Sequence, residues 1–278
     1  MTKTALVVEG GALRSVFSSG VLDGFILQSF DPFDFYLGVS AGASNLAFYK
    51  AGHYGRSYQL FCEIINSKKL INYRQFLMGG HLLDLDWLYT KYINHKTLDL
   101  VKVFDTKRPL YVCVTEVATG KARYITASKD NFPQLFKASM ALPLVYRHFP
   151  SLDGNAMVDG GVADSIPVQR AIDMGATKIM VIRARHQSYL KKDTTGHKII
   201  RRQSRKHPQL LKTMRDRIAL HKQAINTIRQ PPPGIQIIEI CPPESFTPGR
   251  FSHNLKQLAL GYENGLMQST LGIDMFIS

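Results

Sequence analysis

The fold is constrained most by one ten-residue stretch, which reads Phe33-Asp34-Phe35-Tyr36-Leu37-Gly38-Val39-Ser40-Ala41-Gly42. Residues 33–37 predict a buried strand that breaks at Gly38, and the small residues of 41–51 predict a helix. The Gly-x-Ser-x-Gly pattern between them puts Ser40 on a sharp strand-to-helix turn, where Gly38 and Gly42 leave its hydroxyl accessible. Ser40 is therefore a candidate nucleophile with Gly38 and Gly42 as its elbow, and the alternative is a purely structural turn.

Outward from this stretch, apolar runs alternate with helical patterns. Strands are predicted at 4–8, 110–117, 123–126, 178–183 and 235–240, with a hairpin turn at Asp153-Gly154 between 148–152 and 156–158. Helices are predicted at 16–28, through much of 54–103, and at 131–140, 167–174, 207–230 and 255–267. This alternation favours an α/β fold whose parallel or mixed sheet has helices on both faces. We expect a single domain over 1–278, with an insertion-like basic segment at about 184–230.

Composition is that of a globular protein and excludes disordered, collagen-like and coiled-coil classes, because 45% of the 278 residues are hydrophobic and 20% charged. Apolar runs stay well below the ~18 residues of a membrane-spanning helix. The N-terminus has one lysine and a short apolar core before Glu9, unlike a signal peptide. Its three cysteines, Cys62, Cys113 and Cys241, are too widely spaced for a metal site or disulfide framework. We expect a cytoplasmic protein with reduced thiols and no bound metal.

Positive charge is concentrated in one segment. Of the net charge of +14, residues 183–229 supply +12, from 14 Lys or Arg and two acids. Residues 207–230 predict a helix with an apolar face of Leu211, Met214, Ile218, Ile225 and Ile228. The segment is either a packed helix with a solvated basic side or a peripheral contact with an anionic membrane at its inner surface. Nucleic-acid binding is disfavoured because aromatic residues are not interleaved with the charges.

A second motif, Glu9-Gly10-Gly11-Ala12-Leu13-Arg14, follows the first predicted strand. Consecutive backbone N–H groups can converge there, as a phosphate cradle or as an oxyanion hole. The phosphate reading lacks a following Lys-Ser/Thr and a Gly-x-Gly-x-x-Gly pattern. Beside a reactive serine, an oxyanion hole of Gly10, Gly11 and Ala12 fits better than a structural turn. Arg14 meets a lipid phosphate or, as we favour, braces the loop.

The third motif is Val158-Asp159-Gly160-Gly161. The predicted hairpin delivers Asp159 to the end of a strand, and the glycines turn the chain directly afterwards. An aspartate in this position could accept a serine proton without a histidine, although the same sequence also occurs as an ordinary turn.

In this order, the three motifs resemble the patatin-like phospholipase family. The residues that carry the resemblance are the Gly-Gly-Ala-Leu-Arg loop, residues 38–42, residues 159–167 and the Ala-Ser-Met-Ala-Leu-Pro run at 138–143. The resemblance covers residues 4 to about 183 and, more weakly, residues 248–268, which look like the bacterial patatin-like subgroup.

The resemblance implies a three-layer α/β/α core with a mainly parallel sheet, and a Ser40–Asp159 dyad that hydrolyses lipid acyl esters without metal or other cofactor. Two departures stand out, because the family often has glycine where this chain has Ala12 and Ser15. We expect Ala12 to offer its N–H in a slightly narrower hole, provided that its φ is negative. The apolar residues of 54–103 either fill the core, which we favour, or line an acyl channel.

Two rival interpretations remain at this point. One is an α/β-hydrolase esterase with a Ser-Asp-His triad, for which His253 is the candidate histidine and His186 a poorer one. The other is a protein that binds anionic membranes or nucleic acid without turnover, which the basic segment 183–229 would support.

Overall fold

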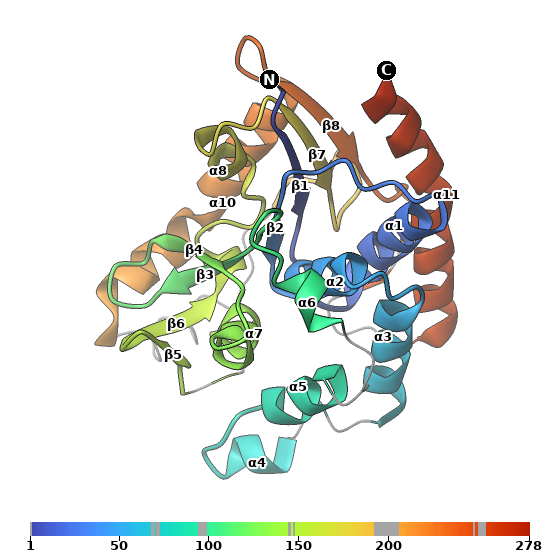
Figure 1. The fold of residues 1–278 in the computed structure, drawn as a ribbon. Coiled ribbons are helices and arrows are strands. Elements are labelled where there is room, and N and C mark those ends of the chain that lie inside the picture. The colour runs from blue at the N-terminus through green and yellow to red at the C-terminus, as the bar shows by residue number, and fades with distance from the viewer. Residues whose placement is uncertain are drawn as a thin grey trace.

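The computed structural model describes residues 2–278 except 68–69, 71–72, 94–98, 144–145, 147, 192–205, 247 and 250–253. Its central element is an eight-stranded sheet surrounded by helices (Figure 1). The strands are β1 (Thr4–Val8), β2 (Phe35–Val39), β3 (Leu110–Glu116), β4 (Ala122–Thr126), β5 (Ser151–Leu152), β6 (Asn155–Asp159), β7 (Lys178–Ile182) and β8 (Gln236–Ile240). The order is β5-β6-β3-β2-β1-β7-β8, with β4 on the other edge of β3.

The helices are η1 (Ala12–Ser15), α1 (Val16–Leu27), α2 (Ala41–Lys50), α3 (Arg56–Ser67), α4 (Tyr73–Leu77), α5 (Leu85–Ile93), α6 (Leu100–Val103), α7 (Phe132–Met140), η2 (Gly160–Val162), α8 (Val168–Asp173), α10 (Pro208–Arg229) and α11 (Leu255–Ile277). β3, β2, β1, β7 and β8 are parallel to one another, whereas β4 and β6 are antiparallel to β3. The expected α/β/α core with a mainly parallel sheet is confirmed.

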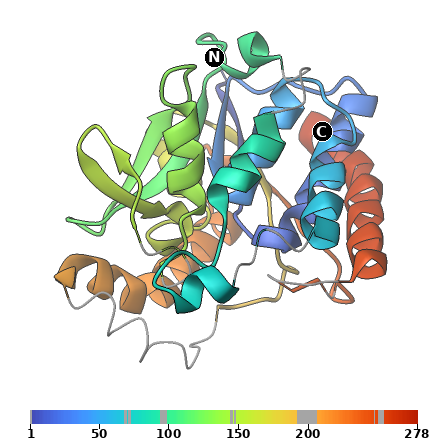
Figure 2. The same ribbon diagram turned by 90° about the horizontal axis from the view of Figure 1, so that it is seen from below.

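Side chains on alternate positions of β1 enter two separate hydrophobic clusters, as the strand's two-residue period requires. Ala5 and Val7 pack with residues of α8 and α10, whereas Leu6 and Val8 pack with residues of α1, α2, α7 and α11. Both faces of the sheet are therefore covered. Figure 2, seen from below, shows α10 and α11 on opposite sides of the molecule.

Two elements extend beyond their predicted ends. The parallel pairing of β2 does not break at Gly38, which lies opposite Val8 of β1 and Val112 of β3. The last helix continues ten residues past 267, to Ile277. Its glycines permit a close approach to α1, because a Cβ on Gly265 would lie 2.2 Å from the Phe17 carbonyl oxygen.

The helical half of the basic segment is packed against the sheet. α10 buries Leu210, Met214, His221, Ile225 and Ile228, so the buried face is rotated slightly from the one expected, and Leu211 and Ile218 are only half-buried. The densest run of basic residues, 192–205, lies outside the described part of the chain.

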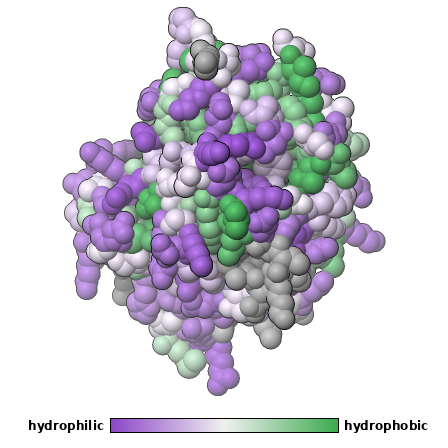
Figure 3. All heavy atoms as spheres, viewed as in Figure 1, coloured by the Kyte–Doolittle hydropathy of each residue, from purple (hydrophilic) through white to green (hydrophobic). Residues whose placement is uncertain are grey.

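The surface seen in Figure 3 is largely hydrophilic, with apolar atoms gathered at the edge formed by α11. Met267, Leu271 and Ile277 are exposed on that helix. None of the helices that the structure describes combines the length and the apolar character needed to cross a bilayer.

Candidate active site

Ser40 occupies a strained turn at the carboxyl edge of the sheet. It follows β2, has φ +54° and ψ −128°, and is the N-cap residue of α2. Non-glycine residues rarely adopt such a conformation, and it persists only where the surroundings enforce it. The Ser40 hydroxyl does not cap the helix and forms no hydrogen bond with any described residue. It therefore remains available to a substrate.

The elbow glycines are required by close backbone approaches. A Cβ on Gly38 would lie 2.4 Å from the Ala43 Cα, and one on Gly42 would lie 2.6 Å from the Val8 carbonyl oxygen. Both distances are shorter than any tolerable contact, so side chains at these positions would displace the turn that holds Ser40.

The glycine loop after β1 lies directly beside Ser40. A Cβ on Gly10 would be 2.9 Å from the Val39 carbonyl oxygen and 3.2 Å from the Ser40 Cβ. Within the described part of the chain, the amides of Gly10, Gly11 and Ala12 donate no hydrogen bond. Unpaired amides next to an accessible hydroxyl can donate hydrogen bonds to an oxyanion, so this arrangement is suited to an oxyanion hole.

Ala12 differs from the expectation. Its φ is +51° rather than negative. Left-handed backbone costs an alanine about 1 kcal/mol, which glycine would not incur. The chain therefore keeps an alanine at a position where the backbone favours glycine.

A buried ion-pair network holds Glu9, the residue that begins the glycine loop. Glu9 accepts hydrogen bonds from the Ala184 amide at 2.8 Å and from Arg183 Nε at 3.2 Å. Arg183 is fully buried at the end of β7 and also pairs with Glu239 of β8. Sequence reasoning missed this network, although an arginine directly after a buried strand was a usable signal.

Arg14 is only 7% exposed and does not line the cavity described below, which disfavours its contact with a lipid phosphate.

Strand pairing brings Asp159 next to Ser40. On β3, Cys113 pairs with Val39 of β2, and the following residue, Val114, pairs with Asp159 of β6. Because β4 occupies the other edge of β3, the ends of β2 and β6 meet on the same edge.

Asp159 is 4% exposed, and its carboxylate accepts a hydrogen bond from the Gly161 amide at 2.7 Å. A hydrogen bond between Ser40 and Asp159 is not formed in this conformation, since the Ser40 hydroxyl has no described partner. The two groups are neighbours through the strands that carry them.

Ser139 connects these parts and was quoted in the sequence analysis only as part of a family motif. Its hydroxyl accepts a hydrogen bond from the Ser40 amide at 2.9 Å and donates one to the Cys113 carbonyl at 3.2 Å. Two residues later, the Ala141 carbonyl accepts from the Asp159 amide at 3.1 Å. The end of α7 thus holds both the serine turn and the aspartate strand.

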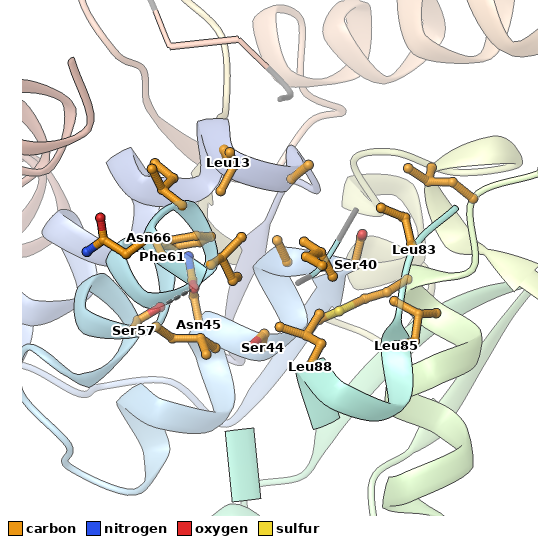
Figure 4. Close-up of a pocket in the computed structure, with 18 of the residues that line it drawn as sticks. Leu13, Ser40, Ser44, Asn45, Ser57, Phe61, Asn66, Leu83, Leu85 and Leu88 are labelled. Atoms are coloured by element: carbon orange, nitrogen blue, oxygen red, sulfur yellow. Dashed lines mark hydrogen bonds between the residues drawn. The ribbon is translucent and has the colours of Figure 1, made fainter. Parts of the chain in front are cut away.

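Ser40 opens on a cavity of about 1040 Å³ (Figure 4). Its walls are mostly apolar and include Leu13, Leu60, Phe61, Ile64, Ile65, Leu83, Leu85, Leu88, Phe136 and Met140. Several of these also belong to the hydrophobic core. The preference for core filling by residues 54–103 was therefore incomplete, because the same side chains wall a space large enough for an acyl chain.

None of the described histidines or cysteines lines the cavity beside Ser40, although Cys113 pairs with Val39 on the neighbouring strand. His186 contacts the Ser188 hydroxyl at 2.9 Å and does not line the cavity, whereas His253 lies outside the described residues. Burial raises the pKa of the Cys113 and Cys241 thiols. The part of the chain that the structure describes contains no grouping of three or more His, Cys, Asp or Glu suited to a metal ion.

Three comparisons bear on this geometry. A patatin-like phospholipase family model matches residues 6–172, and a domain model of unknown function, DUF6363, matches residues 207–273. The uncharacterized protein YjjU of Escherichia coli is 32% identical over 250 residues, which cover 87% of this chain and 69% of that protein. The crystal structure of VipD from Legionella pneumophila superposes with a TM-score of 0.50 and 14% identity, over 99% of this chain and 67% of the other. The expected family is thereby confirmed: this chain belongs to the patatin-like phospholipases.

Proposed function

We propose that this protein is a serine acyl hydrolase that cleaves fatty-acyl ester bonds of phospholipids or related lipids through a Ser40–Asp159 dyad. Family membership supports a lipid acyl hydrolase in general. The observation that carries the finer proposal is the position of Ser40, on a strained turn that faces a large apolar cavity. Asp159 ends the adjacent strand, one residue along β3 from the partner of Val39.

In the first half-reaction, the Ser40 oxygen attacks the ester carbonyl carbon while the Asp159 carboxylate takes the serine proton. The amides of Gly10 and Gly11 stabilise the oxyanion, each contributing up to about 3–4 kcal/mol, whereas the Ala12 amide does not meet the negative-φ condition set for it. The ester C–O bond then breaks, and Asp159 returns the proton to the leaving alcohol. The product is an acyl-enzyme whose chain occupies the cavity.

In the second half-reaction, water attacks the acyl carbonyl as Asp159 takes a proton from it. The fatty acid leaves when the bond to the Ser40 oxygen breaks, and the proton returns to Ser40. Asp159 and Ser40 must come together for both steps. Catalytic hydrogen bonds that are absent without substrate often form only in the enzyme–substrate complex.

The basic segment supports a secondary proposal, peripheral contact with an anionic membrane at its inner surface. The described exposed basic residues of α10 include Lys212, Arg215, Lys222 and Arg229. Each basic residue close to an anionic lipid surface contributes about 1 kcal/mol of binding energy.

The test is hydrolysis of p-nitrophenyl esters of graded chain length, combined with covalent labelling by a fluorophosphonate probe. We expect wild type to be active and labelled, Ser40→Ala to be inactive and unlabelled, and Asp159→Asn to lose at least about a thousandfold in kcat while remaining folded. His253→Ala serves as the control for the triad alternative. Activity lost in His253→Ala but retained in Asp159→Asn would favour the triad, and a wild type that refuses both ester and probe would refute the hydrolase.

A further inference from the structure

A protruding, apolar and basic tip lies beside the cavity. Leu77 and Met78, at the end of α4, are 86% and 73% exposed. Exposed apolar residues that are scattered singly are normal on a protein surface, whereas an adjacent exposed pair on a projecting element is a candidate interaction site. In Figure 1, α4 is the lowest labelled element, and Figure 2 views the molecule from that side.

The tip has a defined backbone conformation. The Gly79 amide donates to the Phe76 carbonyl at 3.2 Å and the Gly80 amide donates to the Gln75 carbonyl at 2.8 Å. With Gly79 at φ +96°, this pattern closes the helix with a left-handed C-cap. The two apolar side chains are therefore displayed by a hydrogen-bonded turn.

The same segment also forms the wall of the cavity. Leu70 precedes α4 in the sequence and Leu83 follows it, and both line the cavity together with Leu85 of α5. The ring of His81 stacks on Tyr146, with centroids 3.8 Å apart, which ties the tip to the loop after α7. The same segment of the chain therefore forms the exposed tip and part of the cavity lining.

The charge of the residues near the tip indicates which kind of partner the tip binds. Arg74 is exposed on α4, and residues 73–83 contain no acid. Of the acids that follow, Asp84 accepts a hydrogen bond from the Trp87 amide and Asp86 pairs with Lys137. An apolar pair next to a cation matches the layered chemistry of a bilayer with anionic lipids, where apolar side chains enter the acyl boundary and cations remain among the head groups.

We propose that the α4 tip, formed by Arg74, Leu77 and Met78, docks on the surface of an anionic lipid bilayer and brings the cavity to its lipid substrate. This inference rests on the proposed function, because a lipid hydrolase has to reach molecules that are packed in a membrane. It differs from attraction by the basic segment, since apolar insertion persists at high salt whereas exposed charges are screened.

The experiment measures partition of the full chain onto vesicles of phosphatidylcholine with one fifth phosphatidylglycerol, at low and high salt. We expect Leu77→Gln/Met78→Gln to weaken partition at least about tenfold at both salt concentrations. Arg74→Gln should weaken it about fivefold at low salt only. Leu27→Gln is the matched control, because Leu27 is 63% exposed but lies on α1, which is well separated from α4 in Figure 1. This variant should partition onto the vesicles as wild type does.

Hydrolysis of a soluble short-chain ester separates this inference from the proposed function. The double variant should retain wild-type activity on that ester and lose activity on vesicle lipid. Inactivity of every variant on the ester would defeat the proposed function but leave the vesicle comparison decisive. Equal partition by wild type and the double variant, an equal loss in Leu27→Gln, or a wild type that binds no vesicle would overturn docking; the last result would favour a protein partner for the tip.

Discussion

Replacing Asp23 by Asn should raise the free energy of unfolding. The gain should appear above about pH 3.8, where the carboxyl of the unfolded chain begins to ionise, and should grow as the pH rises. Asp23 lies on α1, is 3% exposed, and accepts hydrogen bonds from the Tyr262 hydroxyl at 2.7 Å and the Gly55 amide at 3.0 Å. It therefore joins α1 to α11 and to the turn before α3. Burial raises the pKa of the Asp23 carboxyl to about 6 from 3.8, although both hydrogen bonds oppose this rise.

A folded-state pKa above the unfolded value means that the folded state favours the neutral acid. The contribution of Asp23 to stability is fully present below about pH 3.8 and is lost as pH rises through about 6. At about 1.4 kcal/mol per pH unit over this interval, the raised pKa of Asp23 lowers the free energy of unfolding by about 3 kcal/mol at pH 7.5 and by about 1 kcal/mol at pH 4.5. An asparagine keeps a carbonyl oxygen for both donors and cannot ionise.

Urea unfolding followed by circular dichroism at pH 4.5, 6 and 7.5 measures the difference between Asp23→Asn and wild type. We expect a gain in the free energy of unfolding that grows from about 1 to about 3 kcal/mol across that range. Asp216→Asn, at an exposed position of α10, is the control and should change stability by no more than about 0.5 kcal/mol. A gain that does not depend on pH, or a loss at pH 7.5, would refute the assigned burial of the charge.

Three further perturbations test other parts of the fold. Ser139→Ala leaves the partly buried Ser40 amide without its acceptor, so it should destabilise by about 1–2 kcal/mol and slow fluorophosphonate labelling, whereas unchanged labelling would mean that the turn keeps its conformation without Ser139. Gly265→Ala should lower the free energy of unfolding by at least about 2 kcal/mol, because its Cβ meets α1 backbone, while Gly272→Ala should cost less because it meets only the flexible end of Ile240. His221 is buried and its pKa is lowered to about 4, so stability should fall as pH drops from about 6.5 towards 4. His221→Gln should remove that acid sensitivity in the same urea titration, and an unchanged pH profile would count against it.

The strands, helices and turn chemistry were predictable because their signals are local. The β-branched run of 4–8, the turn at Asp153-Gly154 and the Gly-x-Ser-x-Gly elbow all appear in the structure where the sequence indicated them. The full length of α11 was not predictable from local propensity, because Gly272, in the part beyond residue 267, weakens an isolated helix. The role of this glycine becomes clear only from its close approach to Ile240 of β8, more than thirty residues earlier in the chain.

The supports of the site were missed for the same reason. Ser139 and Arg183 act on residues that are about a hundred or more positions away in the sequence, at Ser40 and Glu9. A hydroxyl in a helical pattern and a cation after a strand have many uses, and spacing alone does not choose among them. The cavity is a similar case, because the apolar period of residues 54–103 is the same whether the side chains touch one another or surround a space.

Glycines at the site record where backbone segments approach one another. Gly10 faces Val39, Gly42 faces Val8 and Gly160 faces Cys113, and in each case a Cβ would lie within 2.9 Å of a carbonyl oxygen. These contacts join the ends of β1, β2, β3 and β6, so the glycine pattern fixes the relative position of Ser40, Asp159 and the amide loop together. Ala12 is constrained differently, by a positive φ instead of by a close approach. A conformational cost of about 1 kcal/mol can be carried by the rest of the fold, whereas overlap with a neighbouring backbone cannot, so an alanine is compatible with position 12 but not with the positions of Gly10, Gly42 and Gly160.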